Sequence, residues 1–136
     1  MSKVCSLDTE TTSLNSMTAK LVGISVSINA GTAFYIPINH QDHNYDQLSI
    51  NSINTYLKPT LEDPSIIKIG QNIKYDAHIF LNYGIELNGI NEDTMLMSYV
   101  LENNESHAMD KLSLKYLNHE CISYESLVGK GVKQIT

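Results

Sequence analysis

The sequence contains no arginine and no tryptophan, so all nine of its basic side chains are lysines. Fifteen Asp and Glu residues outnumber them and give a formal net charge of −6 at pH 7. A protein that binds duplex DNA along a broad surface usually carries a basic face, and this charge balance argues against one. The charge is compatible with a small nucleic-acid site in which acidic side chains hold cations.

Long apolar runs and paired cysteines are also missing. No run approaches the length of a membrane span, and the first residues, MSKVCSL, lack the architecture of a secretory signal. Cys5 and Cys121 lie far apart without metal spacing, so we expect reduced thiols in a cytoplasmic protein with no membrane partner. The 136 residues, 42% hydrophobic and 18% charged, predict one globular domain.

The hydrophobic pattern predicts an α/β fold. Strands are expected over residues 3–8, 20–28, 32–38 and 66–70, with another near 85–90. Helices are expected over about 46–57, 74–83, 93–102 and 109–118. The turn Asn29-Ala30-Gly31 suits a short hairpin between the second and third strands. We expect the first three strands to form an antiparallel meander, and Pro37 favours a sheet edge for the third. The fourth strand should lie parallel to the first and beside it, in a mixed sheet flanked by helices.

Asp8 and Glu10 stand one residue apart at the end of the first predicted strand. Residues i and i+2 of a strand point to the same face, so these two carboxylates project together. Neighbouring carboxylates repel each other, which means that either both lie in solvent or a cation lies between them. An acidic pair at a strand end is most often solvated, and alone it is weak evidence for function.

A second polar group follows the fourth predicted strand, in the segment GQNIKYD at residues 70–76. Asn72 and Asp76 are four residues apart and would share one face of a helix start. Taken alone, they are better explained as a helix cap and a first-turn acid than as functional residues. The predicted parallel pairing brings this helix start close to Asp8 and Glu10. Oxygen ligands of this kind select Mg²⁺ or Mn²⁺ over zinc.

Four segments together resemble a known family: DTET with Leu14, then GQNIKYDAHIFLNYGIEL, DTMLMSYVL and LVGKGVKQIT. In this order, and nearly from end to end, they resemble the 3′–5′ proofreading exonuclease domain of bacterial DNA polymerase I, in the DEDD exonuclease superfamily. The resemblance implies a ribonuclease H-like fold over residues 1–136. It also implies that 3′-terminal nucleotides of DNA are hydrolysed with two divalent ions, which in such sites lie about 4 Å apart.

The resemblance further implies roles for individual residues. Asp8 would bridge the two ions, Glu10 would ligate the ion that activates water, and Asp76 would bind the water shell of the second ion. Leu14 would wedge against the 3′-terminal base of a single DNA strand. The other substrate-binding positions would be Thr11, Gln71, Asn72 and Tyr124, the last by stacking on a nucleotide. A polymerase domain would lie in cis if the native chain is longer.

The sequence departs from the family in its third motif, a Tyr followed by an Asp one helical turn later. None of the eight tyrosines has an Asp four residues further on. The first strand also begins closer to Met1 than in the family. We therefore expect a domain truncated at both ends, with weak or absent activity, whether it is a segment of a longer polymerase or a short natural protein.

Two alternatives stay open. An RNase D-type exoribonuclease shares the D-x-E pair and the metals, but the KYD context and the GKG tail count against it. A non-catalytic ribonuclease H-like module of a polymerase is the other, and the presence of Asp8, Glu10, Asn72 and Asp76 counts against that. The polar stretch from His40 to His43 is more typical of a solvated loop than of a zinc site.

Overall fold

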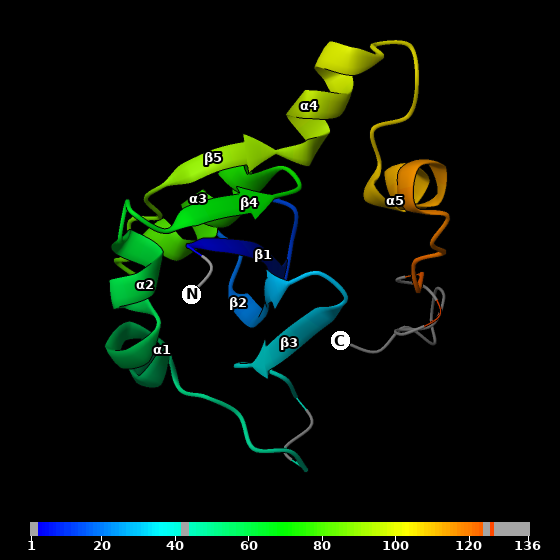
Figure 1. The fold of residues 1–136 in the computed structure, drawn as a ribbon. Coiled ribbons are helices and arrows are strands. Elements are labelled where there is room, and N and C mark those ends of the chain that lie inside the picture. Colours follow the sequence, from blue (N-terminus) through cyan, green and yellow to red (C-terminus); the bar gives the residue numbers. More distant parts are fainter. Residues whose placement is uncertain (1–2, 42–43, 124–125, 127–136) are drawn as a thin grey trace. The chain divides into compact units, whose positions relative to one another are not determined.

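The computed structural model describes residues 3–41, 44–123 and 126 (Figure 1). The chain divides into two compact units, Met1–Thr94 and Met95–Thr136. Across the described ranges, no helix combines the length and the apolar character needed to cross a membrane.

The first unit is built on a five-stranded sheet in the order β3-β2-β1-β4-β5. Its strands are β1 (Val4–Thr11), β2 (Leu21–Asn29), β3 (Thr32–Pro37), β4 (Ile67–Gly70) and β5 (Ile90–Asp93). β1, β2 and β3 pair antiparallel, whereas β4 runs parallel to both β1 and β5. The predicted meander, the parallel strand beside β1 and the edge position of Pro37 are confirmed.

The helices are α1 (Ile50–Tyr56), α2 (Lys58–Glu62), α3 (Ile73–Leu81), α4 (Thr94–Leu101) and α5 (Met109–Leu117). The prediction of a single helix over 46–57 is wrong at its start and misses α2. The Ser49 side chain accepts a hydrogen bond from the Ser52 N–H (3.1 Å), so the first helix begins only after Ser49. Pro59 falls in the first turn of α2, where a residue without an N–H is favoured.

The strand expected near 85–90 is also misplaced, because β5 starts only at Ile90. Ile85 and Leu87 alternate with polar residues and are buried, which produced the strand-like pattern. Gly89 then turns the chain with a φ of 73°, and a Cβ at this position would lie 2.5 Å from the Ile66 carbonyl oxygen. Only a glycine fits this close approach, and the ladder with β4 begins beyond it.

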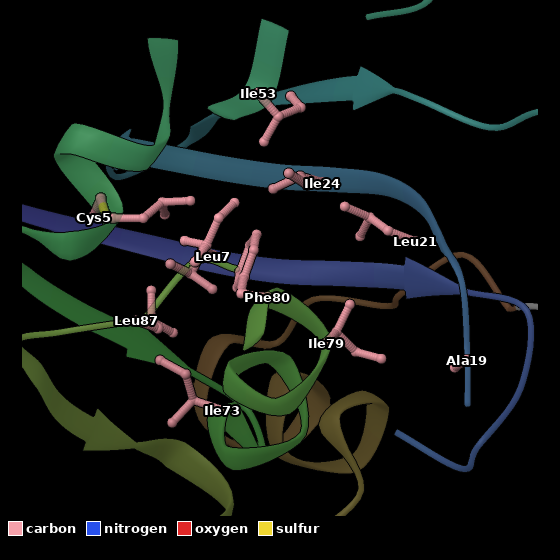
Figure 2. Packing of buried hydrophobic residues seen from close by; sticks show 12 residues of the cluster. Cys5, Leu7, Ala19, Leu21, Ile24, Ile53, Ile73, Ile79, Phe80 and Leu87 are labelled. Atoms are coloured by element: carbon pink, nitrogen blue, oxygen red, sulfur yellow. The ribbon is translucent and has the colours of Figure 1, made fainter. Parts of the chain in front are cut away.

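The core of this unit lies between one face of the sheet and the helices (Figure 2). Leu7 of β1 lies close to Phe80 of α3 in this cluster. Along β1 the residues alternate, so that one face is buried and the other is not. The buried face consists of Cys5, Leu7 and Thr9, and the opposite face carries Ser6, Asp8 and Glu10. The alternation therefore turns both carboxylates away from the core.

In the second unit, α4 and α5 bury no large hydrophobic side chain among the described residues. Polar contacts join its segments. Ser98 Oγ lies 2.8 Å from His107 Nδ1, and the Lys115 ammonium donates to both Glu102 and Glu105. These contacts tie α4 and α5 to the intervening loop.

Candidate active site

The site is formed where β1 extends beyond its neighbour β4. The last paired residues of β1 and β4 are Ser6 and Ile69. β4 ends one residue later at Gly70, whereas β1 continues to Thr11. On the β4 side of β1, the Thr9 N–H therefore has no backbone carbonyl of a neighbouring strand to which it can donate. It donates instead to Asp76 Oδ1 of α3 at 2.9 Å, and the Thr9 hydroxyl donates to the same oxygen at 2.6 Å.

This double hydrogen bond places Asp76 beside β1 at the level of the acidic pair. Thr9 lies between Asp8 and Glu10 in the strand, and its N–H and hydroxyl both fix the carboxylate of Asp76. The structure thus brings the first turn of α3 to the end of β1, where the sequence predicted it.

The start of α3 is held by a residue that the sequence did not indicate. Asn72 occupies the N-cap position with φ 61° and ψ 40°, and Asp76 falls in the first turn, but the Asn72 side chain makes no capping hydrogen bond. The Asp93 carboxylate, at the end of β5, accepts from the N–H groups of Asn72 and Ile73, both at 3.0 Å. A negative charge is favourable at a helix N-terminus. No local motif reveals this contact, because its partners lie 20 and 21 residues apart.

Burial and nearby negative charge raise the pKa of two acidic side chains of the site, Asp8 and Asp76. Burial raises the pKa of half-buried Asp8 to about 6, and the charge of Glu10 contributes in the same direction. Asp76 is only 2% exposed, and burial raises its pKa to about 7. The Asp8 charge adds to that rise, whereas the hydrogen bonds from Thr9 oppose it. The metal-free site therefore carries unfavourable desolvation and repulsion.

The donor chemistry of these residues fits a hard divalent cation. All three candidate ligands are carboxylates, which suit Mg²⁺ or Mn²⁺, and a cation would relieve the repulsion that helps to raise the pKa values of Asp8 and Asp76. Among the described residues, however, no three Asp, Glu, His or Cys side chains converge closely enough to enclose an ion. That observation also gives no support for zinc at His40.

The loop after β1 is anchored on α3. The Tyr75 hydroxyl donates to the Ser13 carbonyl oxygen and also contacts Thr11 Oγ1, both at 2.5 Å. Asn82 Nδ2 donates to the Ser16 carbonyl oxygen at 2.7 Å. Leu14 lies between these anchor points and is 97% exposed. The predicted wedge residue is thus presented to solvent from a loop held at both sides.

The remaining predicted site residues lie in two other places. Gln71 and Asn72 are half-buried in the turn between β4 and α3, where the Thr94 hydroxyl donates to the Gln71 side chain. Tyr124 and the GKG segment lie outside the described residues. The structure therefore places Thr11, Gln71 and Asn72 near the ends of β1 and β4, while the position of Tyr124 stays a prediction.

With this geometry established, comparison with known proteins decides the family. The whole chain, residues 1–136, matches the family described as 3′–5′ exonuclease. It belongs to the 3′–5′ exonuclease family. Within it, the chain is 43% identical over 138 residues to DNA polymerase I of Pseudomonas aeruginosa, covering 98% of this chain and 15% of the relative. It is 39% identical over 148 residues to DNA polymerase I of Rhizobium leguminosarum, covering 95% and 14%. The chain thus spans about one-seventh of these relatives.

Solved structures support the fold of this 3′–5′ exonuclease family member. The POL domain of Pol1 from M. smegmatis, in complex with DNA primer-template and dNTP, has a TM-score of 0.71 at 21% identity, covering 88% of this chain and 20% of its own. NrnC of Brucella melitensis with bound Mg²⁺ has a TM-score of 0.66 at 21% identity, covering 90% and 57%. Escherichia coli RNase D has a TM-score of 0.67 at 20% identity, covering 92% and 30%. The predicted α/β, ribonuclease H-like fold is confirmed.

Proposed function

We propose that this chain is the 3′–5′ exonuclease region of a DNA polymerase I and removes nucleotides from the 3′ end of a single DNA strand. The observation that carries the proposal is the hydrogen-bonded link between Thr9 and Asp76. This link holds a third carboxylate beside the strand that displays Asp8 and Glu10. The relatives named DNA polymerase I supply the substrate class and suggest a polymerase domain in cis.

Asp8, Glu10 and Asp76 would bind two divalent cations, Mg²⁺ or Mn²⁺. When bound, such ions lower the pKa of water for attack on the phosphodiester and stabilise the leaving 3′ oxygen. The contribution of the chain is geometry. Thr9 fixes one oxygen of the Asp76 carboxylate and so sets the direction of the other. The strand keeps Asp8 and Glu10 on one face.

The substrate would be held by apolar and amide groups near the strand ends. Leu14 projects from its anchored loop, where an apolar side chain can pack against a terminal base. Gln71, Asn72 and Thr11 would contact the sugar-phosphate backbone, and Tyr124 would stack on a base. An acidic protein can accept a phosphate in this way because bound cations offset the carboxylate charge.

We further propose that the 136-residue chain is a weak nuclease. The resemblance implies a third motif that supplies one more carboxylate and a tyrosine, and no tyrosine of this sequence has an Asp at the required spacing. A version extended past Thr136 that includes a helix with this Tyr/Asp pair should hydrolyse DNA more rapidly than the present chain.

One observation favours a second candidate, an RNase D-type exoribonuclease. The fold matches RNase D of Escherichia coli about as well as it matches other family structures, with a TM-score of 0.67 over 92% of this chain. At 20% identity this likeness extends to the fold alone, whereas the polymerase relatives reach 43%. Hydrolysis of RNA is therefore the result that would favour this second candidate over the DNA exonuclease.

The test compares DNA and RNA oligonucleotides of one sequence, single-stranded and labelled at the 5′ end, with Mn²⁺ or with a chelator. The chain and its extended version are both assayed, with Glu10→Gln as the control for contaminating nucleases. Shortening of DNA one nucleotide at a time from the 3′ end, lost in Glu10→Gln, is expected. Faster shortening of RNA would favour the second candidate, and a folded extended version that cuts neither would indicate a non-catalytic module.

A further inference from the structure

Tyr35 of the edge strand β3 reaches toward the acidic face of β1. In the sheet register Asp8 is opposite Ser25, and Ser25 is opposite Tyr35, so the three side chains share one face. Glu10, two residues on from Asp8, lies on the same face and is opposite Gly23. The two β2 residues that lie between Tyr35 and the acidic pair are therefore small, namely Ser25 and Gly23.

Gly23 leaves the space that the Tyr35 ring occupies. A Cβ on Gly23 would lie 2.0 Å from the Tyr35 hydroxyl oxygen and 2.4 Å from Cζ, so the hydroxyl stands where a side chain of β2 would begin. Cβ atoms of directly opposed residues in an antiparallel pair are about 4.5–5.5 Å apart. The Tyr35 hydroxyl thus takes the place of the direct cross-strand neighbour of Glu10.

A neutral phenol carries one O–H hydrogen, which it can donate to a carboxylate oxygen.

His40 holds the Tyr35 hydroxyl from the other side. The Nε2 atom of His40 is 2.7 Å from the Tyr35 oxygen, and the two rings meet edge to face at a centroid distance of 5.6 Å. The backbone of His40 is itself fixed by Gln47, whose side chain accepts from the His40 N–H (2.8 Å) and donates to its carbonyl oxygen (3.1 Å). When Nε2 carries the hydrogen, it donates to the phenolic oxygen and leaves the phenolic hydrogen for Glu10.

We propose that Tyr35, held in place by His40, is a positioning residue that donates a hydrogen bond to the Glu10 carboxylate and orients it for cation binding. The inference rests on the proposed function, because it requires Glu10 to be a cation ligand. Carboxylates that bind metals are themselves commonly hydrogen-bonded by such outer partners. This role also explains why β2 carries a glycine opposite Glu10.

The test measures Mn²⁺ affinity, for example from the free-ion signal in electron paramagnetic resonance, with the 136-residue chain. Tyr35→Phe removes the hydroxyl, and Gly23→Ala displaces it by a clash with the far end of a movable side chain. Both should weaken Mn²⁺ binding by roughly tenfold or more while the melting temperature of the metal-free protein changes little. Tyr56→Phe, at a position that is 76% exposed, is the matched control and should bind as the wild type does.

A double-mutant cycle separates the hydroxyl from effects of the backbone. In a Tyr35→Ala background, Gly23→Ala should cause no further loss of affinity, because there is no ring left to displace. A full additional loss in that background would contradict the inference. So would wild-type affinity in Tyr35→Phe.

Glu10→Gln distinguishes failure of this inference from failure of the proposed function. If Glu10→Gln weakens Mn²⁺ binding but Tyr35→Phe and Gly23→Ala do not, the carboxylate is a ligand and only the role of Tyr35 is wrong. If Glu10→Gln binds as tightly as the wild type, the proposed cation site is wrong and the role of Tyr35 fails with it.

Discussion

The two faces of β1 are made by alternate residues of one eight-residue strand, yet they serve different ends. Leu7, on the buried face, packs in the core with Phe80 of α3. Asp8 and Glu10, on the other face, lie where their charges repel. Adjacent residues of the strand point to opposite faces of the sheet. One strand can therefore stabilise the fold with one face and carry an unfavourable group of charges on the other.

Thr9 is the point at which the two faces meet. It belongs to the buried face, but its N–H and hydroxyl hold Asp76, whose charge is coupled to Asp8. Mutations on the two faces of β1 should therefore have different effects. Changes on the buried face should lower stability, changes on the acidic face should alter cation binding and catalysis, and a change at Thr9 should lower both stability and cation affinity.

The largest effect on stability is expected from Leu7→Ala. Leu7 is 2% exposed, and truncation of a buried leucine lowers the free energy of unfolding by about 2–5 kcal/mol. Ser6→Ala, one residue away on the exposed face, should change it by less than about 0.5 kcal/mol. Urea unfolding measures both. Equal losses for the two variants would show that the faces of β1 do not differ as described.

The next effect is a pH dependence of the metal-free protein. The pKa values of Asp8 (about 6) and Asp76 (about 7) lie above the ordinary value of 3.8, so the folded chain binds more protons than the unfolded chain between these values. The contribution to stability is fully present below pH 4 and is lost as the pH rises to about 7. The loss should be roughly 2–4 kcal/mol, with the half-buried Asp8 partly screened by solvent.

Melting temperatures in a chelator, measured from pH 4 to pH 8, check this dependence against variants that cannot ionise. Asp76→Asn and Asp8→Asn should each flatten the decline, and Mn²⁺ should restore stability to the wild type at pH 7.5. A decline of the same steepness in both variants would mean that other groups cause it.

A smaller effect is expected from Thr9→Val, which removes the hydroxyl but keeps the backbone N–H bond to Asp76. A hydrogen bond to a charged group contributes about 1.5–3 kcal/mol, so unfolding at pH 8 should become easier by about that amount. The cation affinity should fall too. Thr9→Ser keeps the hydroxyl and is expected to retain most of both properties, and a Ser variant as weak as the Val variant would argue against the hydrogen bond.

The smallest effect is expected from Asn82→Ala, which removes the exposed anchor between α3 and the Ser16 carbonyl oxygen. Loss of one neutral hydrogen bond should cost about 1 kcal/mol or less. The loop with Leu14 should then be cleaved faster in limited proteolysis, while the core stays intact. Asn51→Ala, at an exposed position of α1, is the control and should leave the cleavage rate unchanged.

Sequence patterns predicted the elements whose order is set locally. Burial alternates along β1, and a two-residue connection joins β2 to β3, so this part of the meander follows from local features. The shared face of Asp8 and Glu10 follows from strand periodicity alone. The family resemblance rested on short contiguous sequence motifs, and the match to the family confirms it.

Contacts between distant segments could not be predicted in the same way. The capping of α3 by Asp93 depends on where β5 ends, and that in turn depends on the turn at Gly89. The reach of Tyr35 across Gly23 depends on the register of β3 on β2. The pattern over 46–57 does not show that the helix begins only after Ser49, and it ends before α2, which the prediction therefore missed.

The most direct test of the central claim is release of the terminal nucleotide from a 3′-labelled single-stranded DNA in Mn²⁺, with Asp8→Ala as the comparison. The assay uses a version extended past Thr136 with the Tyr/Asp helix, alongside the 136-residue chain. We predict release by the extended version that Asp8→Ala lowers about 1,000-fold or more, since cation ligation contributes several kcal/mol to the transition state. Undiminished release by a folded Asp8→Ala protein would contradict the claim that the acidic face of β1 is the active site.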